Sequence, residues 1–185
     1  MLGEAGAKVY CTGRSSRTRL HTSDPDVSGR SETIEETAEM VDAAGGRGIP
    51  IRVDHAAEDE VGSLFERVER DDRRLDVLAL VMRGQPASWK TFSDDEPTAG
   101  LSFVESWIRP HIATAWHAAK LMVSQRSGLM IELVEQDNVG YHGAFYFDLM
   151  ETLLKRLVFG LANELGKHGI TAVGVGPGFM CTEVV

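Results

Sequence analysis

Four side chains that could exchange protons lie within a short stretch of the last third of the sequence. They are two carboxylates, an imidazole and a phenol: Glu135, His142, Tyr146 and Glu151. Together they could perform acid–base chemistry that needs no cofactor, such as isomerisation, dehydration or cyclisation. The competing interpretation is that they are ordinary polar residues on a loop and on one face of a helix.

The histidines and cysteines do not indicate a metal site or a disulfide framework. His111 and His117 are six residues apart, which does not place both on one face of a helix, so we expect no metal. Two cysteines, Cys11 and Cys181, are too few for a small secreted fold held by disulfides.

Strands and helices alternate along the chain. Apolar, β-branched runs predict strands, and apolar residues at helical spacing predict helices between them. The predicted strands cover residues 9–12, 49–53, 75–81, 129–134 and 171–175, and the predicted helices cover about 34–44, 61–68, 102–125 and 145–165. Ser31 or Thr33 can cap the first helix, and Thr33 with Glu36 has capping-box spacing. The alternation predicts one α/β domain over residues 1–185, with a parallel sheet between helices.

Composition excludes several classes of protein. The 185 residues include 19 Lys and Arg against 28 Asp and Glu, a net charge of −9 that disfavours binding to nucleic acid. The longest apolar run, residues 77–82, is too short to cross a bilayer, and the first residues do not resemble a signal peptide. We therefore expect a cytoplasmic protein that binds neither nucleic acid nor membrane.

Several segments, in the right order, resemble the short-chain dehydrogenase/reductase family. Residues 2–14 are similar to the end of the family's first helix and its second strand. Val53-Asp54-His55 resembles the adenine-contacting aspartate after the third strand, and residues 75–78 resemble the run into the fourth. Residues 157–183 resemble the last helix, the sixth strand and a proline-glycine turn. The resemblance implies a Rossmann-like, doubly wound parallel sheet, a nicotinamide cofactor and an Asn-Ser-Tyr-Lys catalytic set.

The sequence departs from the family pattern at the positions that carry hydride transfer. The family's first strand and glycine-rich turn would precede Leu2, so we expect a sheet that lacks both. Residues 134–136 take the place of the catalytic serine without offering a hydroxyl. The tyrosine and lysine positions fall on Phe147 and Glu151, or on Tyr146 and Met150 in a register shifted by one. Neither register yields Tyr-x-x-x-Lys.

These departures leave three hypotheses about function. The first is a non-redox member of the family, acting as a pseudo-enzyme or as a partner subunit. The second is a fragment or divergent form of an NAD(P)-dependent oxidoreductase. The third is a cofactor-independent isomerase, dehydratase or cyclase that uses the inherited cleft.

The resemblance also implies positions that would touch a dinucleotide. These vestigial contacts are Arg14, Ser15, Asp54, Pro177 and Gly178. Arg14, with Arg17 and Arg19, could hold a 2′-phosphate or could belong to a solvated loop, and Asp54 could contact adenine or cap the next helix. We expect no bound cofactor, and NADP if the family's activity survives.

The predicted helix 145–165 carries two adjacent apolar lines, which include Leu153 and Leu157 in one and Met150 and Leu154 in the other. One line would face the sheet, and the other needs a second cover. The family commonly dimerises through two such helices. We therefore expect a homodimer, or a heterodimer with an intact family member, through helices 102–125 and 145–165; a helix buried within the monomer is the competing interpretation.

Overall fold

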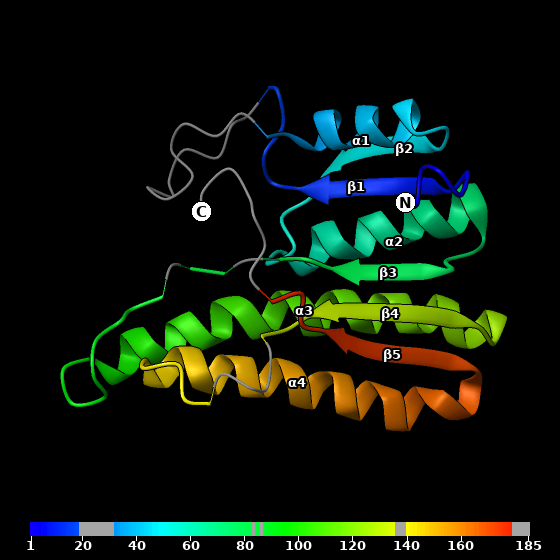
Figure 1. Ribbon diagram of the computed structural model, residues 1–185. Helices are drawn as coiled ribbons and strands as arrows, with labels where there is room; N and C mark the ends of the chain where they lie inside the picture. The colour runs from blue at the N-terminus through cyan, green and yellow to red at the C-terminus, as the bar shows by residue number, and fades with distance from the viewer. Residues whose placement is uncertain (19–31, 83, 86, 136–139, 179–185) are drawn as a thin grey trace. The chain divides into compact units, whose positions relative to one another are not determined.

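The computed structural model describes residues 1–18, 32–82, 84–85, 87–135 and 140–178 (Figure 1). The chain divides into two compact units, residues 1–64 and 65–185. Helix α2 (Glu58–Asp72) runs through the boundary between them. The prediction of one domain over residues 1–185 stays a prediction.

The first unit is a two-stranded parallel sheet with a helix on one face (Figure 1). Strand β1 (Lys8–Gly13) pairs with β2 (Arg47–Arg52), and α1 (Ile34–Ala43) connects them. The side chain of Thr33 accepts the backbone N–H of Glu36 at 3.3 Å, so the predicted cap is confirmed.

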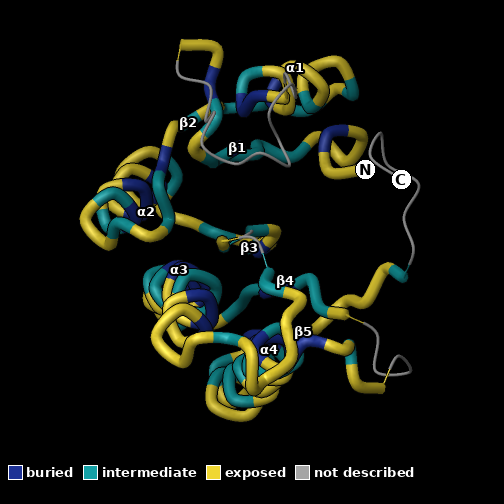
Figure 2. The backbone as a smooth tube through the Cα atoms, turned by 90° about the vertical axis from the view of Figure 1, so that its left-hand side faces the viewer, coloured by how far each residue is buried: buried dark blue, intermediate teal, exposed yellow. Residues whose placement is uncertain are grey.

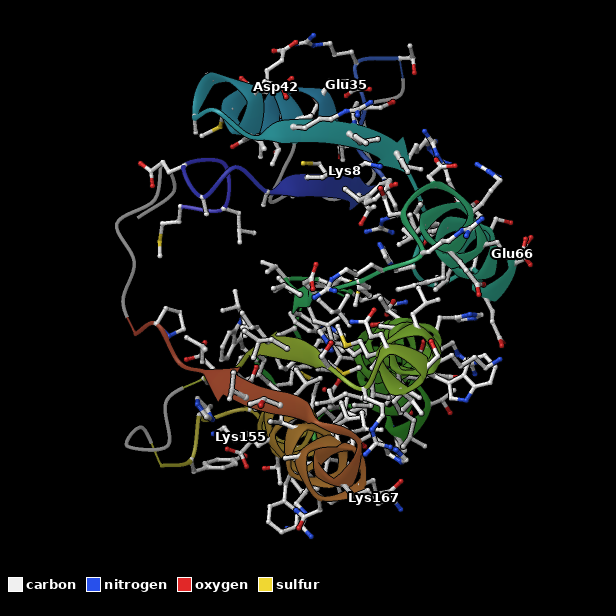
Figure 3. All side chains as sticks on the ribbon, turned by 90° about the vertical axis from the view of Figure 1, so that its right-hand side faces the viewer. Lys8, Glu35, Asp42, Glu66, Lys155 and Lys167 are labelled. Carbon is white, nitrogen blue, oxygen red and sulfur yellow. The ribbon has the colours of Figure 1, made fainter. Side chains whose placement is uncertain are left out.

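Helix α1 approaches β2 closely at one glycine. A Cβ atom on Gly48 would lie 2.2 Å from the backbone oxygen of Ala38, so only glycine fits there. The backbone N–H of Gly48 donates to the Asp42 carboxylate near the end of α1 at 2.7 Å (Figure 3). This contact fixes the beginning of β2 relative to the end of α1.

The second unit is a three-stranded parallel sheet in the order β3-β4-β5. Its strands are β3 (Val77–Leu80), β4 (Gly128–Leu133) and β5 (Ile170–Val175), and its long helices are α3 (Pro97–Gln125) and α4 (Phe145–Leu165). A 3-10 turn, Gly166–His168, joins α4 to β5. Helices α3 and α4 lie side by side on one face of this sheet (Figures 1 and 2).

Helices α3 and α4 both carry buried positions (Figure 2), and apolar side chains of the two helices form one cluster in the core of the second unit. The buried cluster consists of Phe103, Val104, Tyr146, Met150 and Leu154. Gly100 on α3 lets the helices come close, because a Cβ atom there would lie 2.1 Å from the ring of Tyr146. Residues at positions 146, 150 and 154 follow one face of α4, so the cluster sets how α4 is turned about its axis.

The parallel α/β arrangement predicted from the sequence is confirmed. Among the described strands, β1 pairs only with β2, and β3 pairs only with β4. Within its own described sheet, each of these two strands is therefore an edge strand. None of the helices that the structure describes is long and apolar enough to cross a membrane.

Candidate functional site

Glu151 connects α4 to the segment that follows β4. Its carboxylate accepts the backbone N–H of Glu135 at 2.9 Å, and Glu151 is buried while the side chain of Glu135 is exposed. Phe147 precedes Glu151 by one helical turn, so both belong to the same side of α4. The Glu151 carboxylate thus lies beside the segment that follows β4, one helical turn after the ring of Phe147.

Burial raises the pKa of Glu151, and the negative charge of Glu135 adds to the rise. The hydrogen bond from the Glu135 backbone opposes the rise in this pKa, as do the charges of Lys155 and His142. Lys155 follows one turn later on α4 (Figure 3). A carboxyl whose neutral form is favoured can give or take a proton closer to neutral pH than an exposed one.

His142 forms a second proton-exchanging pair with Asp148 on the first turn of α4. Nδ1 of His142 lies 2.9 Å from Oδ1 of Asp148, and that oxygen also accepts the backbone N–H of His142 at 3.4 Å. The hydrogen bond from the His142 side chain holds the pKa of Asp148 below its usual value. A carboxylate only accepts, so Nδ1 carries the proton and Nε2 is the second nitrogen available for chemistry.

The Nε2 atom of His142 is buried, and within the described part of the chain it has no hydrogen-bond partner. The imidazole meets the ring of Phe147 edge-on, with centroids 5.5 Å apart. Phe147 therefore joins the two pairs: His142 lies against its ring, and Glu151 follows it on the helix. Glu135, His142 and Glu151, three of the four residues predicted from the sequence, come together here.

The loop after β3 covers the start of α4 with aromatic rings. The indole of Trp89 packs on the ring of Phe147, with centroids 5.4 Å apart. The ring of Phe92 packs against Phe145 and Tyr146 in the same way. The indole N–H of Trp107 on α3 donates to the backbone oxygen of Gln85 at 2.9 Å and anchors the beginning of this loop.

Tyr146, the fourth predicted residue, lies in the buried cluster against α3. Sequence reasoning placed it in the cleft because it is the phenol nearest to the expected position. Met150, one turn later on the helix, is buried as well, so the face of α4 that carries both residues faces the core. Sequence reasoning also missed Asp148, although an acid in the first turn of a helix six residues after a histidine was a usable signal.

Two side chains of the first unit that were considered for dinucleotide contact, Arg17 and Asp54, are bonded to other groups of the protein. The guanidinium of Arg17 forms a bidentate pair with Glu39, with two bonds of 2.7 Å. The Asp54 carboxylate accepts the backbone N–H of Ala56 at 3.0 Å, which forms an Asx turn before α2; the expectation that Asp54 caps the next helix stays a prediction. Arg14 is exposed, whereas Arg19 lies outside the described residues.

The remaining predicted contacts lie beside strand ends. The backbone oxygen of Ser15 accepts the N–H of Ile34, the first residue of α1. Pro177 and Gly178 follow β5, and Gly178 has a φ of 70°. A hydrogen bond that sequence reasoning missed joins Thr12 Oγ1 and His55 Nε2 at 2.9 Å, between the ends of β1 and β2. The described residues contain no group of three or more potential metal ligands.

A family model described as "Enoyl-(Acyl carrier protein) reductase" matches residues 4–185. A mouse protein, "Dehydrogenase/reductase SDR family member 1", is 29% identical over the whole chain, and the human protein of that name is 28% identical. The chain belongs to the short-chain dehydrogenase/reductase family. It spans 56% of the length of each of these two relatives.

Solved structures of this family share the fold. A metagenomic short-chain oxidoreductase in complex with NADP superposes with a TM-score of 0.77 and 18% identity, covering 99% of this chain and 76% of that one. A putative gluconate dehydrogenase from Agrobacterium tumefaciens gives a TM-score of 0.79 and 19% identity, covering 99% and 66%. The family resemblance seen in the sequence and the predicted fold class are thus both confirmed.

We predict that Glu151→Gln alters the pH dependence of stability. Because the pKa of Glu151 is raised in the folded state, its stabilising contribution is complete below the ordinary value of 4.5 and is lost as pH rises. The amide oxygen introduced by the substitution would still accept the Glu135 N–H without titrating. The stability of the variant relative to the native chain should therefore increase from pH 4.5 to 7.5 in urea unfolding.

Glu164→Gln, on an exposed part of α4, is the matched control and should follow the native chain at every pH. A stability difference between Glu151→Gln and the native chain that does not change with pH would contradict a raised pKa of Glu151 in the folded state.

Proposed function

We propose that this chain is a non-redox member of the short-chain dehydrogenase/reductase family, which keeps the fold without transferring hydride. The observation that carries the proposal is the pair Phe147 and Glu151, one turn apart beside the end of β4. In the family, a tyrosine and a lysine are expected at these two positions. Such a protein would act as a pseudo-enzyme or as a partner subunit.

The chemistry of the two side chains supports this proposal. Phe147 has no proton to give to a substrate oxygen. Glu151 carries the opposite charge to lysine, so it would raise the pKa of a neighbouring phenol where lysine lowers it. Losing an acid–base group typically costs a factor of about 10²–10⁴ in rate. The serine position, at residues 134–136, offers no hydroxyl either.

The packing of α4 favours this register over the alternative. Tyr146 and Met150, the shifted pair, contribute to the core with α3 and would have to leave it to reach the end of β4. Turning α4 to expose them would also break the hydrogen bond between the Glu151 carboxylate and the Glu135 N–H. The cost of both changes supports Phe147 and Glu151 as the residues that take the catalytic positions.

The proposal extends to the cofactor, which we expect this chain not to bind. A related structure holds NADP. Here Arg17 is already paired with Glu39, and Asp54 caps its own turn, so both side chains are engaged before any adenosine could reach them. Glu151 would also place a carboxylate where the family's lysine meets the ribose hydroxyls. NADP remains the expected cofactor under the alternative, an NAD(P)-dependent oxidoreductase.

Calorimetric titration tests the cofactor proposal. We expect no heat of binding with NADPH or NADH at physiological concentrations of cofactor. The double variant Phe147→Tyr, Glu151→Lys should also give no measurable heat of binding, because Arg17 remains paired with Glu39 and Asp54 remains bonded to the Ala56 N–H. A dissociation constant near the micromolar range for the native chain would overturn the proposal and favour the oxidoreductase.

A second candidate function is acid–base catalysis without a cofactor, and the geometry of His142 favours it. With its Nδ1–H donated to Asp148, the neutral imidazole presents a lone pair on Nε2, the arrangement of a general base oriented by a carboxylate. Glu151, with its raised pKa, is the group suited to return the proton. Isomerisation, dehydration and cyclisation each need one such base and one such acid.

Substitutions test the second candidate on any cofactor-free turnover of ketone, enone or epoxide substrates. His142→Gln should lower the rate by about 10²-fold or more, because the amide cannot take a proton. Glu151→Gln should have a similar effect, and Glu135→Gln a smaller one, since its side chain is exposed. Unchanged turnover in all three variants would move the chemistry elsewhere, whereas no turnover at all would favour the pseudo-enzyme.

We also propose that the chain pairs through α3 and α4, as a homodimer or with an intact family member. Both helices expose large apolar side chains: Ile112 and Trp116 on α3 are each 50% exposed, and Phe159 on α4 is 53% exposed. Leu153, which the sequence placed in one of the apolar lines, packs against the core cluster. A charge at Leu153 would therefore destabilise the fold itself and would not test pairing alone. Exposed apolar surface of this kind favours a partner.

Light scattering tests the assembly. We expect a species of twice the chain mass of 20.3 kDa, reduced to a folded monomer by the double change Ile112→Glu, Phe159→Glu. Charges buried without partners at an interface disfavour association strongly. Met40→Glu, at an exposed apolar position on α1, is the matched control and should leave the dimer intact. A native chain that stays monomeric and soluble at high concentration would contradict the homodimer.

A further inference from the structure

A histidine and a glutamate meet inside the second unit, away from the pair on α4. His111 on α3 is 1% exposed, and Glu132 on β4 is 3% exposed. Nδ1 of His111 lies 2.9 Å from both carboxylate oxygens of Glu132, and its hydrogen bond is directed at Oε2. Charged side chains are almost never buried this deeply unless they are paired with another polar or charged group.

Little around the pair can neutralise a net charge. Strands β3 and β5, on either side of β4, contain no titratable residue. On α3, Arg109 is paired with Glu105 at the exposed surface, and on α4 the carboxylate of Glu151 is bonded to the Glu135 backbone. Within the described chain, Nε2 of His111 and Oε1 of Glu132 are buried without hydrogen-bond partners.

We propose that His111 and Glu132 act as a latch that holds a single proton and makes the packing of α3 on β4 sensitive to pH. The inference does not depend on the proposed function. With one proton the pair is neutral overall, whether the proton sits on the imidazole or on the carboxyl. With none it leaves a buried negative charge, and with two a buried positive charge, and both cost free energy that the interior does not return.

Burial raises the pKa of Glu132, and the contact with His111 opposes the rise, which agrees with a pair that resists losing its proton. In the unfolded chain the two groups separate, and they titrate near their ordinary values of about 4.3 and about 6.5. Above about pH 6.5 the unfolded chain has therefore released the proton that the folded chain keeps. The stabilising contribution of the latch is therefore complete between about pH 4.3 and about pH 6.5, and it declines as pH leaves this interval in either direction.

The position of the latch links it to the candidate site. Glu132 is three residues before Glu135, whose backbone N–H is held by Glu151. Deprotonation would leave the Glu132 carboxylate charged between α3 and β4. The resulting cost in free energy would destabilise β4, the strand that leads to the contact between Glu135 and Glu151. We expect rising pH to loosen the end of β4 before the unit unfolds.

Nuclear magnetic resonance on the native chain tests the proton count directly. The side-chain carbon of Glu132 and the ring nitrogens of His111 each report protonation. At pH 7.5 we expect one of the two groups, and only one, to be protonated, with no titration step of His111 between pH 5.5 and 7.5. Both groups deprotonated at pH 7.5, or a His111 step within that interval, would overturn the proposal.

Urea unfolding between pH 6.5 and 8.5 supplies the matched comparison. For the native chain the unfolding equilibrium constant should rise with pH, the latch contributing a factor that approaches about tenfold per unit. Glu132→Gln removes the retained proton, so the logarithm of its unfolding constant should rise by up to about one less per pH unit than that of the native chain. Glu105→Gln, on the exposed face of α3, should keep the native dependence on pH. Equal slopes for Glu132→Gln and the native chain would also overturn the proposal.

Discussion

The packing of α4 against α3 is the constraint on which the candidate site depends. Tyr146, Met150 and Leu154 enter the core beside Phe103 and Val104, and this fixes the rotation of α4. Once these three are buried, the helical period leaves Phe147 and Glu151 on the side that meets the end of β4. The packing of the core therefore decides which residues of α4 lie in the candidate site.

Two buried glutamates of the second unit each accept a hydrogen bond from a group other than lysine or arginine. Glu151 is held by a backbone N–H, and Glu132 by an imidazole, and burial raises the pKa of both. A carboxyl held in this way prefers its neutral form, whereas the lysine of the family's catalytic set acts by being charged. Under the function that we propose, this difference in sign, more than the loss of a single group, would distinguish the chain from its reductase relatives.

The sequence predicted well the features that depend on neighbours along the chain. The alternation of strands and helices, the Thr33 cap and the parallel sheets all follow from local spacing and composition. The proximity of Glu135 and Glu151 was also predictable, because the end of a strand and the first turns of the next helix meet at one edge of a parallel sheet.

Features that depend on packing between distant segments were not predictable in the same way. The Arg17–Glu39 pair joins residues 22 positions apart, and nothing in the spacing shows that this arginine is already occupied. Tyr146 differs from Phe147 by a rotation of about 100° on the helix, which only the core decides. Likewise, Trp89 reaches Phe147 from a loop whose course has no periodic pattern.

Hydride transfer itself is the step to measure, because we infer that the chain retains the family fold without the family's redox chemistry. NADPH carrying deuterium at the transferred position of its nicotinamide ring would be incubated with the chain and a panel of ketones and enones, and the products analysed by mass spectrometry. We expect no deuterium in any product above the level of a protein-free control. Deuterium that enters a reduced product only when the chain is present would contradict this inference.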